Sequence, residues 1–359
     1  MALKKKTIIL ILIMAALLLI LVGGLFVIPK IKSYIPYYKD KMGIDQQDLP
    51  YTLTIEKTDF ENEVVKRLAE NDVVVSSVRF LNYIKTKYPD FVWYNGVYHL
   101  NANMSYEELC QALMKPDEEI NYVKLVVPEG KTVAAIAKLV EEAGLCAEQE
   151  FLSAADHYDY PYDFLKELKE RNQKTIGYKL EGYLFPATYE FRADTVTAAE
   201  IVESMLKAFN DYVTDDMIKS AQNMGLSLNE FVSLASVVQA EAFSTDSMAG
   251  VAGVFWNRLN SKGMRMLQSD PTTNYAKSLS SLANYSTEMK NAYDTYKCIG
   301  LPVGPTNCPG VDALKAVLNP EKSDYYYFVT DKNGNFYFNE TLNEHNKTIR
   351  SLVNQGLWA

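Results

Sequence analysis

The stretch Ser227-Leu-Asn-Glu-Phe-Val-Ser-Leu-Ala-Ser-Val-Val-Gln-Ala-Glu-Ala-Phe243 predicts a helix that carries a carboxylate on its apolar face. Ser227 and Glu230 have the spacing of a capping box, so the helix should begin near Leu228. At about 100° per residue its apolar side chains share one face. Glu241 falls within that face, where a charged group is not expected in a helix that packs on a core.

Glu241 is therefore the first candidate for a catalytic residue. Apolar surroundings disfavour the ionised carboxylate, and the negative end of the helix dipole does the same near the last turn. Both effects should raise its pKa, and a carboxylic acid that is still protonated near neutral pH is what a general acid for glycosidic cleavage needs. The alternative is a last-turn glutamate that reaches solvent and takes no part in chemistry.

Composition and motifs exclude several classes of protein. The 359 residues carry 36 Lys and Arg against 45 Asp and Glu, a net charge of −9 that argues against nucleic-acid binding. With 48% apolar and 23% charged residues, the chain should fold into two or three globular domains. It shows no metal-ligand set, no Gly-rich phosphate loop and no G-x-S-x-G motif, so we expect chemistry without a metal or cofactor.

The N-terminus predicts a membrane anchor. Residues 7–29 contain no charged side chain, and as a helix these 23 residues would span about 34 Å, enough to cross a bilayer. Residues 1–6 carry three lysines and are expected in the cytoplasm, although lysines also follow the apolar run. Residues 30–50 are predicted to form a juxtamembrane linker. The rest of the chain should then lie outside the cell membrane, as the body of a single-pass protein.

The body divides into three predicted parts. Residues 51–118 have a strand–helix–helix–strand pattern, typical of a small α+β module. Residues 119–175 predict a second α+β module that connects it to residues 176–359, where helices alternate with Gly-, Pro- and Asn-rich loops. The clearest strand patterns lie at 52–56, 98–100 and 122–128, and the clearest helix patterns at 61–71, 76–87, 105–114 and 132–143.

Two loops carry further candidate binding residues. The turn 180–186 is rich in aromatic residues, which stack on sugar rings, and it includes Glu181 and Tyr183. In isolation this turn could equally be a core turn with a capping glutamate. Gln268 and Asp270 lie on a second loop, where Asp-Pro marks the start of a helix.

The C-terminal third offers weaker signals. The loop 300–310 is rich in prolines, which stiffen the backbone, and in glycines, which permit tight turns. Shaped loops of this kind often line binding sites. Tyr325–Val329 alternates as a buried strand, so we expect its tyrosines in the core. His345 is isolated and is expected to make local hydrogen bonds. Cys298 and Cys308 bracket the Gly/Pro-rich loop and could pair, but unpaired thiols fit the sequence equally well.

Several blocks in this order make the chain resemble the MltG-type (YceG-like) endolytic murein transglycosylase family. Each block is weak by itself, whereas their joint order is specific. The catalytic glutamate of the family closes a motif whose earlier glutamate is replaced here by Gln239, which leaves Glu241 as the one carboxylate of that motif. The blocks are 180–186, 235–241, 254–259, 267–271, 293–296 with 300–302, and 327–329 with His345 and Asn346.

The resemblance implies non-hydrolytic cleavage of the MurNAc–GlcNAc β-1,4 bond in peptidoglycan. Glu241 would protonate the leaving oxygen and then, as a carboxylate, take the proton of the MurNAc C6 hydroxyl, which attacks C1 to leave a 1,6-anhydro end. Since this nucleophile belongs to the substrate, the paired carboxylates of other glycosidases are not needed. We expect the groove to be lined or supported by Glu181, Tyr183, Asn257, Gln268, Asp270 and Tyr296.

The resemblance also implies an architecture and partners. The fold class would be α+β, with a single N-terminal transmembrane helix, small LysM-like α+β modules and a C-terminal mixed α+β catalytic domain. Peptidoglycan strands would be the substrate, and penicillin-binding proteins and other proteins of cell-wall synthesis would be partners.

Two other functions are compatible with the same sequence. The first is a non-catalytic, membrane-tethered peptidoglycan-binding scaffold, which the substitution at Gln239 would allow. The second is a hydrolytic muramidase in which Glu181 or Asp270 assists Glu241. Product analysis separates the three, since only the transglycosylase makes anhydro ends.

Overall fold

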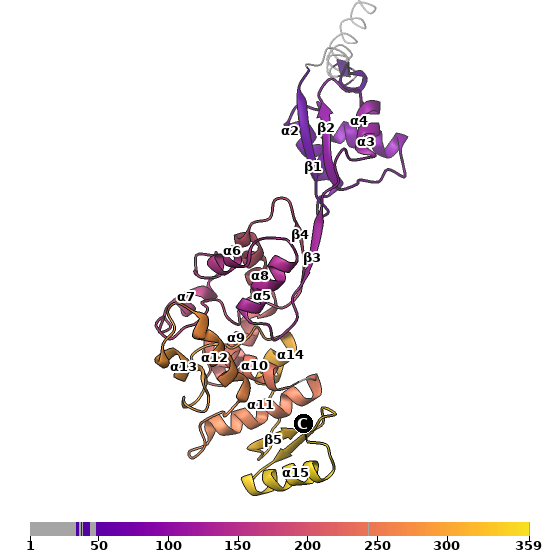
Figure 1. Cartoon of the computed structure of the whole chain (residues 1–359). Coiled ribbons are helices and arrows are strands. Elements are labelled where there is room, and N and C mark those ends of the chain that lie inside the picture. Colours follow the sequence, from indigo (N-terminus) through magenta and orange to yellow (C-terminus); the bar gives the residue numbers. More distant parts are fainter. Residues whose placement is uncertain (1–33, 36, 38, 44–47, 243, 359) are drawn as a thin grey trace, which may run out of the picture. The chain divides into compact units, whose positions relative to one another are not determined.

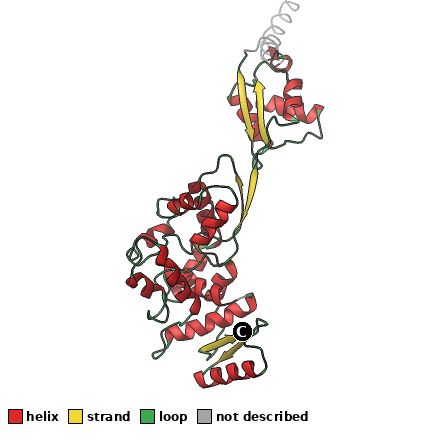
Figure 2. Ribbon diagram, in the orientation of Figure 1, coloured by secondary structure: helices red, strands yellow, loops and turns green. Residues whose placement is uncertain are grey.

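The computed structural model describes residues 34–35, 37, 39–43, 48–242 and 244–358. Contacts within the chain divide it into two compact units, Met1–Asn121 and Tyr122–Ala359. Figure 1 labels the elements of both units, and Figure 2 shows that helices predominate, with short pairs of strands.

The predicted fold class needs a correction at the N-terminus. Within the described part of the chain, no helix is both long and apolar enough to cross a membrane. The segment predicted to do so, 7–29, lies outside the described residues. The fold is thus mixed α+β, and the transmembrane helix is not retained as part of it.

The N-terminal unit contains one antiparallel pair of strands with helices. The strand β1 (Pro50–Ile55) pairs with β2 (Gly96–Asn101), so that Leu53 lies opposite Tyr98. The helices are α2 (Glu61–Glu70), α3 (Ser77–Lys87) and α4 (Tyr106–Leu113), which confirms the elements predicted there. The predicted capping box at Ser105 and Glu108 is also present. Buried apolar side chains from all five elements form one core.

The C-terminal unit opens on a strand whose partner is distant in sequence. The strand β3 (Tyr122–Val126) pairs antiparallel with β4 (Thr188–Arg192). Between them lie α5 (Val133–Glu142), α6 (Glu148–Ala154) and α7 (Phe164–Lys169). Side chains of residues 122–175 belong to the same core cluster as those of the following helices, so this segment and the rest of the unit share one hydrophobic core.

Several helices pack against α10, the helix that ends at Glu241. Apolar residues of α10 (Leu228–Glu241) are buried almost all round, consistent with a central position. It contacts α14 (Val311–Leu318), α11 (Thr245–Asn260) and α12 (Asp270–Ser278). The other helical elements are α8 (Ala198–Tyr212), α9 (Asp215–Asn223), the 3-10 helix η1 (Leu279–Ser281) and α13 (Thr287–Tyr293).

The unit ends in a small sheet covered by a helix. The strands β5 (Tyr327–Thr330) and β6 (Phe336–Asn339) pair antiparallel, and α15 (Leu342–Asn354) packs on both, as Figure 1 shows. The strand β5 also contacts α11. This arrangement places one wall of aromatic residues next to the C-terminal part of α10.

Candidate active site

The helix that carries Glu241 forms as its sequence predicts. Ser227 and Glu230 make both hydrogen bonds of the capping box, at 2.9 Å and 3.3 Å. The helix ends at Glu241, two residues earlier than predicted, because Ala242 is already extended with φ −110° and ψ 129°. Glu241 is therefore the last helical residue, where its side chain can leave the helix surface toward a neighbouring cleft.

Glu241 lines a cleft of about 330 Å³ built from six parts of the C-terminal unit. Its lining residues come from the last turn of α10, from α11, β5 and α15, from the start of α12 with the residues just before it, and from the loop after α13. The lining residues are Glu241, Phe255, Arg258, Gln268, Asp270, Tyr296, Tyr327, Phe328, Leu342 and His345.

The carboxyl of Glu241 is half-buried and held by one side chain. The hydroxyl of Ser269 donates a hydrogen bond to Glu241 Oε1 at 2.6 Å. Burial raises the pKa of Glu241, and the negative charge of Asp270 adds to that rise. The Ser269 bond and the positive charge of Arg258 oppose it, but the net pKa is raised. The group thus has the property predicted for a general acid.

Arg258 is a buried cation beside the cleft. It exposes 7% of its surface, and its Nε donates to the carbonyl of Tyr326 at 2.7 Å. A second guanidinium nitrogen donates to the carbonyl of Leu267. These bonds join α11 to β5 and to the loop that carries Ser269, so Arg258 fixes the walls of the cleft relative to each other.

Asp270 and Tyr296 both line the cleft and are hydrogen-bonded to each other. The Tyr296 hydroxyl donates to Asp270 Oδ1 at 3.0 Å. Burial and this bond raise the pKa of Tyr296 to about 12, so the phenol stays protonated and can donate to an acceptor. Gln268, two residues before Asp270, has φ +51°, an uncommon value for a residue with a side chain. The cleft therefore joins three predicted binding residues to Glu241.

The other three predicted binding residues lie elsewhere. Glu181 exposes 1% of its surface, and it accepts hydrogen bonds from Val133 N and from the Tyr275 hydroxyl, both at 3.0 Å. Burial raises the pKa of Glu181 to about 8. Tyr183 is fully buried, and Asn257 donates to the carbonyls of Ser323 and Tyr325. These side chains support the fold rather than line the cleft.

Several lining residues were missed or misjudged from the sequence. Tyr327 was expected in the core, but it lines the cleft and is only partly buried. His345 stacks on Tyr327 with 5.4 Å between ring centroids, and its buried Nδ1 has no hydrogen-bond partner among the residues that the structure describes. Arg258 and Ser269 lie within sequence blocks 254–259 and 267–271, which carry the family resemblance. The sequence pattern alone does not reveal that they contact the site.

Gln239 takes no part in the cleft. Its Oε1 accepts a hydrogen bond from Gly310 N at 2.9 Å, and its side chain also bonds Glu129. Burial, followed by the charge of Asp312, raises the pKa of Glu129. Gln239 therefore links the last turn of α10 to the start of α14 and to the turn after β3.

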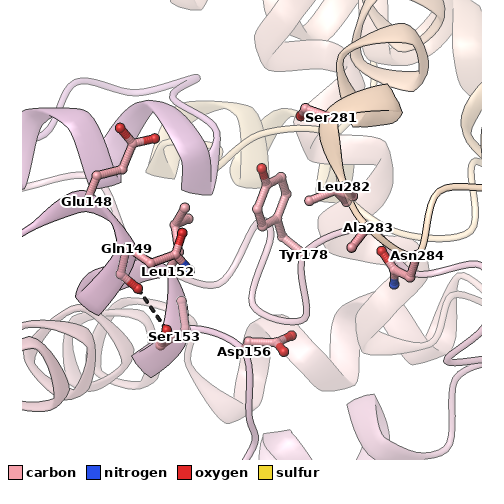
Figure 3. Close-up of a pocket in the computed structure, with 12 residues that line it drawn as sticks. Glu148, Gln149, Leu152, Ser153, Asp156, Tyr178, Ser281, Leu282, Ala283 and Asn284 are labelled. Carbon is pink, nitrogen blue, oxygen red and sulfur yellow. Dashed lines mark hydrogen bonds between the residues drawn. The ribbon is translucent and has the colours of Figure 1, made fainter.

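A larger cavity, of about 630 Å³, lies between α6 and the segment that follows η1. Figure 3 shows Tyr178 between Glu148 on one side and Leu282 on the other. None of the residues that line the cleft at Glu241 borders it. Since Glu241 is the predicted acid, the smaller cleft is the candidate active site.

Metal ligands and disulfides do not contribute to the described site. Within the part of the chain that the structure describes, no group of three or more His, Cys, Asp or Glu side chains could hold a metal ion. All four cysteines are free thiols, so of the two states that the sequence allowed for Cys298 and Cys308, the structure has the unpaired one.

Comparisons with known proteins agree with the order of the sequence blocks. Residues 53–351 match the YceG-like family. The endolytic murein transglycosylase of Bacillus subtilis (strain 168) is 31% identical over 340 residues, which cover 93% of this chain and 91% of that protein. The protein of the same name from Streptococcus pneumoniae serotype 2 (strain D39 / NCTC 7466) is 32% identical over 289 residues, and the match spans 51% of it.

A solved structure shows the same relationship. The crystal structure of a yceG-like protein from Listeria monocytogenes is 30% identical, with a TM-score of 0.54. The similarity covers 84% of this chain and 100% of that chain. On the family match and these relatives, the chain belongs to the YceG-like family.

Proposed function

We propose that this protein is an endolytic murein transglycosylase in which Glu241 is the general acid and base. The observation that carries the proposal is a half-buried carboxyl that lines a cleft, is bonded to the Ser269 hydroxyl and has a raised pKa. The names of the relatives from Bacillus subtilis and Streptococcus pneumoniae support peptidoglycan as the substrate.

The proposed reaction has two proton transfers and needs no external nucleophile. Glu241 gives its proton to the glycosidic oxygen as the bond from MurNAc C1 to that oxygen breaks. The resulting carboxylate then accepts the proton of the MurNAc C6 hydroxyl, whose oxygen forms the new bond to C1. Glu241 regains the proton that it lost, and the products are a new GlcNAc hydroxyl and a 1,6-anhydroMurNAc end.

The cleft offers complementary groups for this reaction. As positive charge develops at C1, the carboxylate of Asp270 can stabilise it, because the two charges are opposite and the cleft is partly desolvated. The hydroxyl oxygen of Tyr296, whose proton is donated to Asp270, can accept from a sugar hydroxyl, and Gln268 offers an amide. We assign the binding role to these three residues, and not to Glu181, Tyr183 or Asn257, whose polar groups are already engaged elsewhere.

Glu241→Gln tests the proposal directly. The variant should fold as the wild type does, because Gln can still accept the Ser269 bond, but it should give no anhydro-ended products from purified peptidoglycan by mass spectrometry. Glu142→Gln, at an exposed position on α5, is the matched control and should keep full activity. Full activity of Glu241→Gln would refute the mechanism.

The same products separate the transglycosylase from a muramidase. The muramidase remains a second candidate because Asp270 lines the same cleft as Glu241 and could activate a water molecule. In that case the new ends would be reducing sugars instead of anhydro ends. Binding without any change in the glycan would instead indicate a scaffold.

The proposed substrate also implies a location and partners. Since peptidoglycan lies outside the cytoplasm, we infer that the C-terminal unit acts there. The family resemblance supports proteins of cell-wall synthesis, penicillin-binding proteins among them, as the partners that supply newly made strands. Affinity isolation after cross-linking in growing cells, with the Glu241→Gln variant as bait, tests this inference.

A further inference from the structure

Ser269 is the side chain that determines how the Glu241 carboxyl is presented to the cleft. Its hydroxyl donates to Oε1 at 2.6 Å, and no hydrogen bond reaches Oε2 from the residues that the structure describes. We infer that Ser269 is a positioning residue that reserves Oε1, so that Oε2 is the atom that delivers and recovers the proton. This inference rests on the proposed function and adds a residue and an atom to it.

Ser269 itself has little freedom to move. It exposes 1% of its surface, its backbone N–H donates to Thr295 Oγ1 at 2.9 Å, and its carbonyl accepts from Thr272 Oγ1 at 2.7 Å. The two threonine hydroxyls also contact each other at 2.8 Å. Both backbone groups of Ser269 are therefore engaged, which leaves its hydroxyl to the carboxyl of Glu241.

The same segment joins both sides of the cleft. Ser269 bonds Thr295, while the next residue, Asp270, accepts from Tyr296, which follows Thr295. The Gln268 N–H also donates to the Thr295 carbonyl at 3.3 Å, from its uncommon positive-φ conformation. Three successive residues, two in the loop before α12 and the first of α12 itself, thus attach this segment to the loop after α13, and this attachment holds the Ser269 hydroxyl against the end of α10.

A neutral hydroxyl donor suits a carboxyl that alternates between two protonation states. Ser269 can donate to Oε1 whether Oε2 carries a proton or the group is ionised, and it keeps its own proton throughout. The bond is stronger to the carboxylate than to the acid. It therefore favours the proton transfer to the glycosidic oxygen, while the other oxygen stays available for both steps.

Charged and titratable groups on every neighbouring element also act on Glu241. Arg258 on α11 and Ser269 lower its pKa, whereas burial and Asp270 on α12 raise it. The remaining groups that line the cleft are the phenols of Tyr296 and Tyr327 and the imidazole of His345. Because Ser269 and Asp270 are consecutive and act in opposite directions, substitutions at the two positions should move the pKa of Glu241 in opposite directions.

The test measures the titration of Glu241 separately from catalysis. In protein labelled with 13C at glutamate side-chain carboxyls, the Glu241 signal is assigned by its loss in Glu241→Gln and followed against pH. Ser269→Ala should raise that pKa by about one to two units, the size expected for one hydrogen bond to a carboxylate. Asp270→Asn should lower it. Ser278→Ala, whose hydroxyl bonds the Tyr275 carbonyl outside the cleft, is the control and should leave it unchanged.

Activity provides the second measurement. Ser269→Ala should lower kcat/KM about 10- to 100-fold, mostly through kcat, and should move the basic limb of its pH profile to higher pH. Ser269→Cys, which keeps a weak donor, should recover part of the loss and stands in if the alanine variant does not fold. An unchanged Glu241 pKa in both Ser269 variants overturns the inference. A second outcome separates the two proposals. If the pKa of Glu241 moves in the Ser269 variants, but neither they nor the wild type make anhydro ends, the proposed function fails while the positioning role stands.

Discussion

Arg258 lies over the ring of Tyr327, with 5.5 Å between the guanidinium carbon and the ring centroid. The contact joins α11 to β5 beside Glu241, and the same guanidinium donates to the carbonyls of Tyr326 and Leu267. This buried cation therefore helps to hold the small β5–β6 sheet against α11, so the geometry of the cleft depends in part on it.

Arg258→Lys should destabilise the protein although it keeps the charge. A lysine cannot donate to both carbonyls in the fixed geometry of a guanidinium, so at least one buried acceptor loses its partner. We expect the free energy of unfolding, measured by chemical denaturation, to fall by about 2–4 kcal/mol. A change below about 0.5 kcal/mol, the range of ordinary surface substitutions, would show that the two carbonyl bonds do not hold the sheet.

Asn257→Ala should lower stability without weakening glycan binding. Asn257 donates to the carbonyls of Ser323 and Tyr325 at 2.8 Å and 2.9 Å, and alanine leaves both unpaired. We expect a loss of about 1–3 kcal/mol in denaturation and an unchanged KM. Asn260→Ala, one turn further along α11, removes an exposed bond to its own helix and is the control. A raised KM with normal stability would restore the binding role first predicted for Asn257.

Glu181→Gln should change how stability depends on pH. Burial raises the folded-state pKa of Glu181 from 4.5 to about 8, so the folded protein holds a proton that the unfolded chain releases between these values. The stability that this group contributes is present below about pH 4.5 and is lost as pH rises toward about 8.

Glutamine cannot ionise, so the stability of Glu181→Gln relative to wild type should rise across that range, by an amount on the order of a few kcal/mol. Thermal unfolding at a series of pH values gives the comparison, with Glu142→Gln as the exposed control. Parallel curves for wild type and Glu181→Gln would mean that the Glu181 carboxyl is ionised in the folded protein.

Gly253→Ala should destabilise the protein by forcing α11 away from the segment that precedes β5. An added Cβ would meet the carbonyl oxygen of Glu321 well inside contact distance, and that backbone is itself tied to α11 by the bond from Glu321 N to the Ala249 carbonyl at 2.9 Å. Because a backbone atom cannot move aside as a side-chain end can, we expect a loss of about 1–3 kcal/mol. Gly263→Ala, with open space around its Cβ, should be close to neutral.

The parts of the fold that the sequence predicts well are those that depend on neighbouring residues. The capping box at Ser227 and Glu230 and the apolar periodicity after it are local, and α10 forms there as expected. The strand and helix patterns of the N-terminal unit are equally local. The pairing of β3 with β4 was not predicted, because three helices separate these strands along the chain.

Within the candidate site, the sequence could indicate only a residue whose chemistry differs from that of its neighbours along the chain. Glu241 stands out because it interrupts an apolar face. Glu181 is a predicted binding residue because it lies in an aromatic turn of the sequence. Its carboxyl is instead buried against Val133 N and the Tyr275 hydroxyl, which are distant in sequence. Arg258 and His345 reach the cleft through the packing of β5 and α15, which periodicity cannot indicate.

The bridge that Gln239 makes between Gly310 and Glu129 has a consequence for how the protein responds to its surroundings. A glutamate at this position, as in the motif that this sequence resembles, would bring a third carboxylate to a place already occupied by Glu129 and Asp312. The amide accepts from Gly310 N and donates to Glu129, which an ionised carboxylate could not do, and it adds no charge. The junction between α10 and α14 thus carries less charge repulsion than three carboxylates would give, and it should depend less on salt than a junction with a glutamate at position 239.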